Sequence, residues 1–179
     1  MPNRRAVLAS TAAAVSTTLA GCLNAVSGGL GEEGVSLSGQ KREIIETYSD
    51  GIDESNAGTT AWNNGIPLLN DEEYGDAVDQ FERAVEHFEE AKGIFSEARQ
   101  GASDIEEEDG ARLIADAVER MRLMIEAASA ALDAAQAGVN GEDRSTINEH
   151  IKTAQAKEEE ATSIELRETD VVAAALGNE

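Results

Sequence analysis

The stretch that decides the fold is YGDAVDQFERAVEHFEEAKGIFSEA, residues 74–98. Aromatic residues recur in it every seven positions, and alanines recur at the same interval three positions later. A seven-residue interval keeps these side chains on one side of an α-helix, and most of the remaining positions are polar or charged. The stretch therefore predicts an amphipathic helix whose buried side alternates large rings with small side chains. The residues of this stripe are Tyr74, Ala77, Phe81, Ala84, Phe88, Ala91, Phe95 and Ala98.

A second seven-residue pattern, made of glycines, lies in the preceding helical stretch, residues 37–69. Gly51, Gly58 and Gly65 are seven positions apart. A glycine inside a helix costs about 1 kcal/mol relative to alanine. Three of them at one helical position therefore predict a packing role, which is the close approach of another helix. We expect these glycines to receive the aromatic rings of the helix that follows.

Local signals predict where the helices begin and end. Pro67 is expected to kink or end the first helix and to push Ile66 out of helical geometry. Gly101 predicts the end of the second helix. Two Ser/Thr-x-x-Glu patterns predict capping boxes at the starts of the third and fourth helices, at residues 103–106 and 146–149.

Two further helical stripes complete the chain. The fourth is weak in its middle, where Lys157 and Glu158 stand at positions expected to be apolar. Short connections make neighbouring helices antiparallel, and no strand pattern occurs. The sequence therefore predicts an all-α domain over residues 36–177, an antiparallel four-helix bundle of long helices. The third stripe is Ile114, Val118, Met121, Ile125, Ala128, Leu132, Ala135 and Val139, and the fourth is Ile147, Ile151, Ala154, Ala161, Ile164, Val171 or Val172, and Ala175.

Residues 1–21 predict a signal peptide of the twin-arginine (Tat) type. Arg4 and Arg5 form the arginine pair, and residues 6–20 are weakly apolar, too short and too polar for a stable transmembrane helix. Small residues then precede Cys22, the single cysteine, in a pattern that resembles a lipobox, at which the cysteine is lipid-modified. The alternative is a free cysteine beside an ordinary cleavage site. The lipobox residues before the cysteine are Leu19, Ala20 and Gly21.

The N-terminal features predict where the protein is located. Residues 22–35 contain four Gly residues and one Ser and are expected to be a flexible linker between the lipidated cysteine and the bundle. Two acyl chains on Cys22 would anchor the protein firmly in the membrane. The helical domain is therefore expected at the extracellular face of the cell membrane, held there by its lipid.

The charge of the chain restricts its partners. The net charge is −22, and from Cys22 onward 12 Lys and Arg residues face 36 Asp and Glu residues, a net charge of −24. Such a chain repels nucleic acid and anionic lipid, so no nucleic-acid partner is expected. Disorder is the other explanation of strong acidity, but the helical register of the apolar residues argues against it. A surface suited to molar salt explains the composition better.

Two resemblances follow from these residues. The acidic, exported chain as a whole resembles the Tat lipoproteins of haloarchaea that carry tetratricopeptide-like helices. The pattern Tyr74-x-x-Ala77-Val78-x-x-Phe81-x-x-Ala84-Val85, with Ala61-Trp62 and Gly65 before it, looks like one tetratricopeptide repeat. Pro67, the missing Asp-Pro at the repeat's end and the lack of a second copy depart from that family. The resemblance implies a helical hairpin; arrays of such repeats bind peptides, but one unit does not form their groove.

Few residues suggest chemistry. His87 and His150 lack the Glu three positions earlier that a di-iron bundle requires, so both are predicted at the core boundary. The acidic runs 106–109, 158–160 and 89–90 are predicted to be solvated, the first of them at the start of a helix. Met121, Met124, Trp62 and Tyr48 are predicted in the core.

These observations predict a protein that is not an enzyme. No catalytic, cofactor-binding or metal-binding residues are assigned, because no known constellation occurs. The leading function is a membrane-anchored, non-catalytic interaction or scaffold module that contacts a cell-surface or membrane protein. The alternative is an accessory lipoprotein that binds a ligand or a divalent cation.

Overall fold

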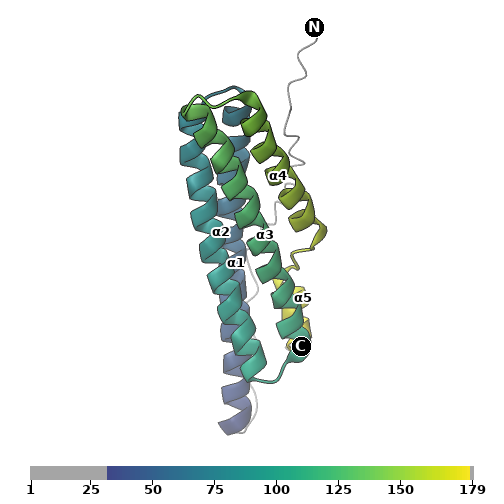
Figure 1. The fold of residues 1–179 in the computed structure, drawn as a ribbon. Helices are drawn as coiled ribbons and strands as arrows, with labels where there is room; N and C mark the ends of the chain where they lie inside the picture. The colour runs from purple at the N-terminus through teal and green to yellow at the C-terminus, as the bar shows by residue number, and fades with distance from the viewer. Residues whose placement is uncertain (1–31, 178–179) are drawn as a thin grey trace.

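The computed structural model describes the backbone of residues 32–177 and the side chains of residues 38–177. Within this range the protein is all-helical, with no strand, and five helices pack against one another (Figure 1). The predicted all-α class is therefore confirmed. The helices are α1 (Glu32–Asn70), α2 (Tyr74–Asp104), α3 (Glu108–Val139), α4 (Arg144–Ser163) and α5 (Thr169–Ala175).

The hairpin of α1 and α2 is built on glycines that face aromatic rings. A Cβ atom added to Gly58 would lie 2.7 Å from Phe88 ring carbons, and Gly51 and Gly65 face Phe95 and Phe81 in the same way. All three rings are fully buried. The predicted pairing of α1 glycines with α2 rings is therefore confirmed, and it sets the antiparallel register of the hairpin.

Aromatic residues of α1 extend this packing. The ring centroids of Tyr48 and Phe95 are 5.1 Å apart, and those of Trp62 and Phe81 are 5.5 Å apart, both pairs tilted. Tyr48 and Trp62 are buried, as are Met121 and Met124, so all four lie in the core as predicted.

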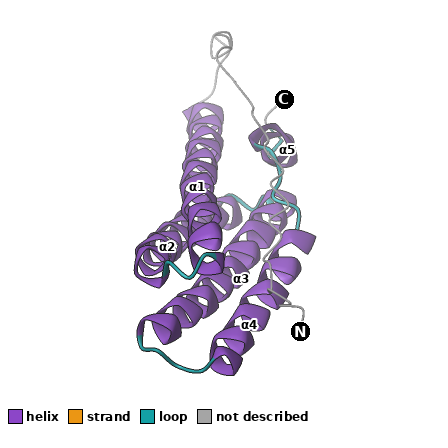
Figure 2. Cartoon of the chain, turned by 90° about the horizontal axis from the view of Figure 1, so that it is seen from above, coloured by secondary structure: helices purple, strands orange, loops and turns teal. Residues whose placement is uncertain are grey.

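The order of the layers follows from the helix contacts. In Figures 1 and 2, α3 lies between α2 and α4. The long helices pack in sequence, α1 on α2, α2 on α3 and α3 on α4. Among the described residues, the Cα atoms of α1 and α4 nowhere come within 8 Å of each other, so only side chains join these two helices. The short α5 packs on α1 and α3 near the start of α3.

Two predicted features of the first helix differ from the structure. α1 continues through Ile66 and Pro67 to Asn70, with Ile66 buried and helical. The proline removes a single hydrogen bond of the last turn, and the buried Leu69 favours completing that turn. α1 also begins at Glu32, inside the stretch predicted as a linker; residues 22–31 of that stretch lie outside the described residues.

The predicted capping boxes are both wrong. Ser103 lies within α2, where its hydroxyl donates to the carbonyl of Arg99, and Gly101 does not end that helix. Thr146 lies within α4, which is capped instead by Asp143, whose carboxylate accepts from the backbone N–H groups of Ser145 and Thr146.

The first three long helices end in the same way instead. In each turn, a residue with positive φ follows the helix, and the next N–H returns to a carbonyl five residues earlier. The positive-φ residues are Glu72, Glu106 and Gly141. Glutamate rarely adopts this conformation, so the first two turns gave no glycine signal in the sequence.

The predicted fourth helix is interrupted. α4 ends at Ser163, and residues 164–168 connect it to α5. Val172 of α5 is buried, as is Leu176 directly after the helix. A helix continuing beyond Ser163 would place Glu165 and Glu168 on the buried stripe, since they follow the same spacing as Ile151. Ending the helix resets the register, so that apolar residues enter the core again.

The glycine–ring packing gives a testable expectation. Gly58→Ala should lower the free energy of unfolding by about 1–3 kcal/mol, since the added methyl group meets a buried ring. Gly93→Ala is the matched control: Gly93 is exposed on α2, and no heavy atom lies within 4 Å of its added Cβ. The control should gain up to about 1 kcal/mol. Urea denaturation measures the free energy of unfolding of both variants. An equal increase in the free energy of unfolding for Gly58→Ala and Gly93→Ala would contradict the packing.

Candidate functional site

The residues predicted for export and lipidation lie outside the described part of the chain. Within residues 32–177, no helix has both the length and the apolar character needed to span a membrane. The predictions for these positions are therefore unchanged by the structure. The residues are Arg4, Arg5, Leu19, Ala20, Gly21 and Cys22.

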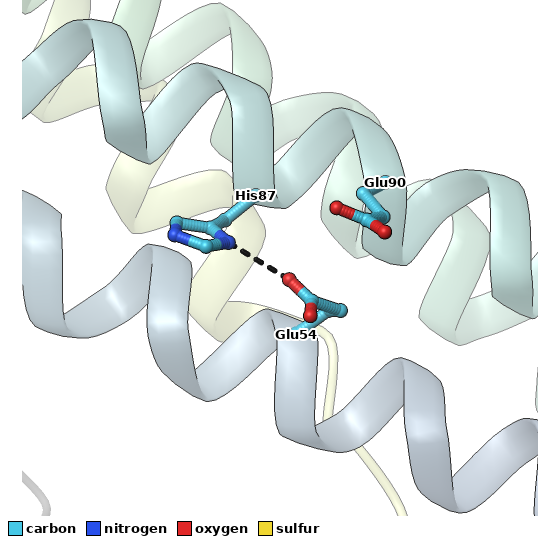
Figure 3. A group of neighbouring side chains, drawn as sticks. All are labelled: Glu54, His87 and Glu90. Atoms are coloured by element: carbon cyan, nitrogen blue, oxygen red, sulfur yellow. Dashed lines mark hydrogen bonds and ion pairs between the residues drawn. The ribbon is translucent and has the colours of Figure 1, made fainter.

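One group of potential ligand atoms stands out among the described residues. Glu54 projects from α1, and His87 and Glu90 project from α2, into the space between the two helices (Figure 3). His87 Nδ1 lies 2.8 Å from Glu54 Oε2. One ligand atom from each of the three side chains lies within 4.8 Å of the others. An imidazole and two carboxylates at this distance form a potential site for a divalent cation.

The hairpin register brings these side chains together. His87 is next to Phe88, whose ring fits against Gly58, and Glu54 lies one turn before that glycine. The close approach of the helices therefore also sets the distance between their flanking polar residues. The Glu54 and His87 side chains are 31% and 37% exposed, and Glu90 is exposed, so water reaches all three.

The second histidine lacks such a group. His150 Nδ1 lies 3.9 Å from Asp133 Oδ2, and its side chain is also 37% exposed. Both histidines are thus half-buried at the edge of the core, as predicted. Among the described side chains, only His87 belongs to a group of three potential ligands.

A second polar group closes the space between α1 and α4. Trp62 Nε1 donates to Glu158 Oε1 at 3.3 Å, and Tyr48 Oη donates to the Arg167 carbonyl at 2.7 Å. Arg120 of α3 donates to the Ile164 carbonyl at 2.6 Å. The bonds from Tyr48 and Arg120 attach the α4–α5 connection to the core. The connection can accept them because its carbonyl groups are not used in helical hydrogen bonds.

Burial perturbs two of these groups. Desolvation raises the pKa of Tyr48, so its hydroxyl stays protonated and remains a donor. Desolvation also raises the pKa of Glu158, although its hydrogen bond from Trp62 acts in the opposite direction. Glu158 is therefore not a solvated residue like Glu159 and Glu160, and that part of the prediction for the acidic run is wrong.

Of the other two acidic runs, residues 89–90 are exposed as predicted, and residues 106–109 lie at the start of α3 as predicted. Glu108 and Asp109 lie in the first turn of α3, where negative charge interacts favourably with the helix dipole. Glu107 pairs with Lys41 at 2.7 Å, and Asp109 pairs with Arg112 at 3.0 Å. These partners already neutralise half of the run, which does not gather its carboxylates around one point.

Sequence reasoning missed the group on the α1–α2 hairpin. Neither histidine follows a Glu by three positions, but His87-x-x-Glu90 has the same one-turn spacing in reverse order. Glu54 is 33 positions from His87, so only the hairpin register could add it. The predicted glycine–ring pairing supplied that register, and placing the flanking positions on it would have found the group.

Comparison of the chain with protein-family models, with curated proteins and with solved structures found no match. The resemblance to haloarchaeal lipoproteins and to tetratricopeptide repeats therefore remains a prediction from sequence.

The buried position of Glu158 predicts a pH effect on stability. Its raised pKa means that the protonated form stabilises the fold at low pH, and this contribution is lost as pH rises through the folded-state pKa. Glu158→Gln keeps an acceptor for Trp62 and removes the charge, so it should be more stable than wild type at pH 7.5. The difference should shrink toward pH 4.5, where glutamate is increasingly protonated.

Urea denaturation at constant ionic strength measures this difference. Glu159→Gln is the control, since it removes one charge from the neighbouring exposed position. If the stability gained in Glu158→Gln does not depend on pH, or if Glu159→Gln gains as much, burial of the Glu158 carboxylate is not the cause of the stability difference.

Proposed function

We propose that this chain is a lipid-anchored, non-catalytic interaction module at the extracellular face of the membrane of a salt-adapted archaeon. The helical domain acts as an antiparallel four-helix bundle with a tetratricopeptide-like first hairpin. Its partner is a cell-surface or membrane protein. The acylated Cys22 fixes the module to the membrane, and the bundle presents its surface to that partner.

The observation that carries this proposal is the order of the features along the chain. The arginine pair and the lipobox precede a rigid helical domain that begins at Glu32, ten positions after Cys22. Ten residues of chain span at most about 35 Å. An anchor on Cys22 would therefore hold the start of α1 close to the membrane, whatever conformation the intervening residues adopt.

The shape of the domain supports a contact made at a distance from the membrane. α1 has 39 residues, so it extends roughly 58 Å from its first residue to its last. The turn after α1 and the turn after α3 lie together at that far end, where Arg144 pairs with Glu72 at 2.7 Å (Figure 1). The end of the domain opposite the anchor would thus face outward.

This outer end also carries exposed apolar surface. Val139, predicted in the third buried stripe, is instead 59% exposed, because α3 ends there beyond the core. It lines a surface hollow at the junction of α2 and α3. We place the contact with the partner protein in this hollow. Its lining residues are Gly75, Val78, Gln136, Val139 and Asn140.

The location is tested with substitutions in the export and anchor residues. The wild-type chain should fractionate with membranes, and its intact mass should show loss of residues 1–21 and addition of lipid. Cys22→Ser should release the protein from the membrane, and Arg4→Lys with Arg5→Lys should leave it unprocessed inside the cell. A wild-type protein recovered in soluble form with its first 21 residues attached would overturn the proposed location.

The partner contact is tested by site-specific crosslinking in intact cells. A photo-crosslinking residue at Val139 should capture one membrane or surface protein reproducibly, and the same residue at Gly93, an exposed position within α2, should not. Equal capture at both positions, or none at Val139, would remove the proposed contact surface without affecting the proposed location.

The acidic surface predicts salt-dependent stability. Negative charges several Å apart repel each other at about 0.1 M salt, where the Debye length is about 10 Å. At about 1 M salt the Debye length is about 3 Å, so the same repulsion is screened. The melting temperature should therefore rise with KCl over this range. A triple variant, Glu82→Gln, Glu86→Gln and Glu89→Gln, removes three exposed charges from α2. Its melting temperature should be higher than that of the wild type at low salt and should rise less as KCl is added. Identical salt profiles for the two proteins would contradict a role of surface repulsion.

A further inference from the structure

We propose that Glu54, His87 and Glu90 bind one divalent transition-metal ion, of the borderline class that includes Zn²⁺. This site is independent of the lipid anchor and of the partner contact. The three side chains come from two helices and place one ligand atom each within 4.8 Å of the others (Figure 3). Water would occupy the remaining coordination positions, because all three side chains are partly or fully exposed.

The charge around the group favours a cation. Glu90 makes no hydrogen bond or ion pair with any described residue, and the partner of Glu54 is His87. Two carboxylates therefore lie near each other with no Lys or Arg between them. Elsewhere the chain neutralises such pairs: Arg122 bridges Glu119 and Glu126. A divalent ion would supply the positive charge that no Lys or Arg side chain provides at Glu54 and Glu90.

The scaffold holds the ligands in position. Gly58 and the buried Phe88 fix the spacing of α1 and α2 one turn or less from Glu54 and His87. Ligand atoms around Zn²⁺, at bond lengths of about 2.0–2.1 Å, are separated by about 3.3 Å in a tetrahedron. His87 Nδ1 and Glu54 Oε2, now 2.8 Å apart, would therefore separate by about 0.5 Å. Ligand atoms as far apart as 4.8 Å would approach by about 1.5 Å, which rotation of the partly exposed glutamate side chains provides.

The imidazole selects the class of ion. Nitrogen ligands favour Zn²⁺, Co²⁺, Ni²⁺ and Cu²⁺, whereas Mg²⁺ and Ca²⁺ prefer oxygen ligands alone. His87 Nδ1, which faces Glu54, offers a lone pair when the ring proton is on Nε2. Ion binding would then replace the present contact between His87 and Glu54. Selectivity for Zn²⁺ over Mg²⁺ distinguishes this site from general attraction of cations to an acidic surface.

Calorimetry on the full-length protein tests the site. Titrations with Zn²⁺ and with Mg²⁺ in about 1 M potassium nitrate screen the exposed surface charges and avoid chloride as a competing ligand. The wild-type protein should bind one Zn²⁺ at least tenfold more tightly than Mg²⁺. His87→Ala should weaken Zn²⁺ binding tenfold or more, and so should Glu90→Gln, which removes a carboxylate that makes no structural contact.

His150→Ala is the matched control, because its side chain has the same exposed fraction but only one neighbouring carboxylate, at 3.9 Å. It should bind Zn²⁺ like the wild type. The Co²⁺ absorption spectrum adds a direct test of nitrogen ligation, and its ligand-field bands should change in His87→Ala. Thermal melts without metal establish that each variant is folded. Zn²⁺ affinity that is unchanged in both His87→Ala and Glu90→Gln, or no tighter than Mg²⁺ affinity, would overturn the proposal.

Discussion

The close approach of α1 and α2 is the constraint on which the rest of the structure depends. Glycines spaced by seven residues leave room for buried rings, and the rings lie where a Cβ atom of any other residue would stand. Because a ring cannot slide past a backbone it already touches, the two helices have one register. α3 packs on this hairpin mainly through α2 and contributes many small buried alanines.

The same arrangement explains why the fourth helix is irregular. The Phe rings of α2 point toward α1, so the space between α1 and α4 is filled by Trp62 and Tyr48, whose polar atoms need partners there. Glu158 and the carbonyl of Arg167 provide them. The polar residue in the middle of α4 and the extended segment after α4 therefore supply the hydrogen-bond acceptors that the two buried aromatic residues need.

The sequence predicted the features that depend on local steric fit and failed where distant contacts decide. The facing of Gly58 and Phe88 was predictable, since the glycines and the rings repeat at the same seven-residue interval on consecutive helices. The helix ends were not, because Glu72 and Glu106 adopt a conformation that favours glycine, and because Ser103 and Thr146 lie inside α2 and α4 rather than before a first turn. The break after Ser163 depends on the buried hydroxyl of Tyr48, 119 positions from its acceptor, and no window of sequence contains both.

The candidate site lies between these two cases. The spacing of His87 and Glu90 in the sequence predicts that they share one turn of α2. Glu54 lies beside them only because of the hairpin register. Steric fit in the core therefore determines electrostatics at the surface: the glycines that admit the rings also bring a third ligand to the other two. In a chain with three acidic residues for each basic residue after Cys22, few such groups can be neutralised by Lys or Arg. A carboxylate pair held together by packing and left without a basic partner is where such a chain has most to gain from a bound cation.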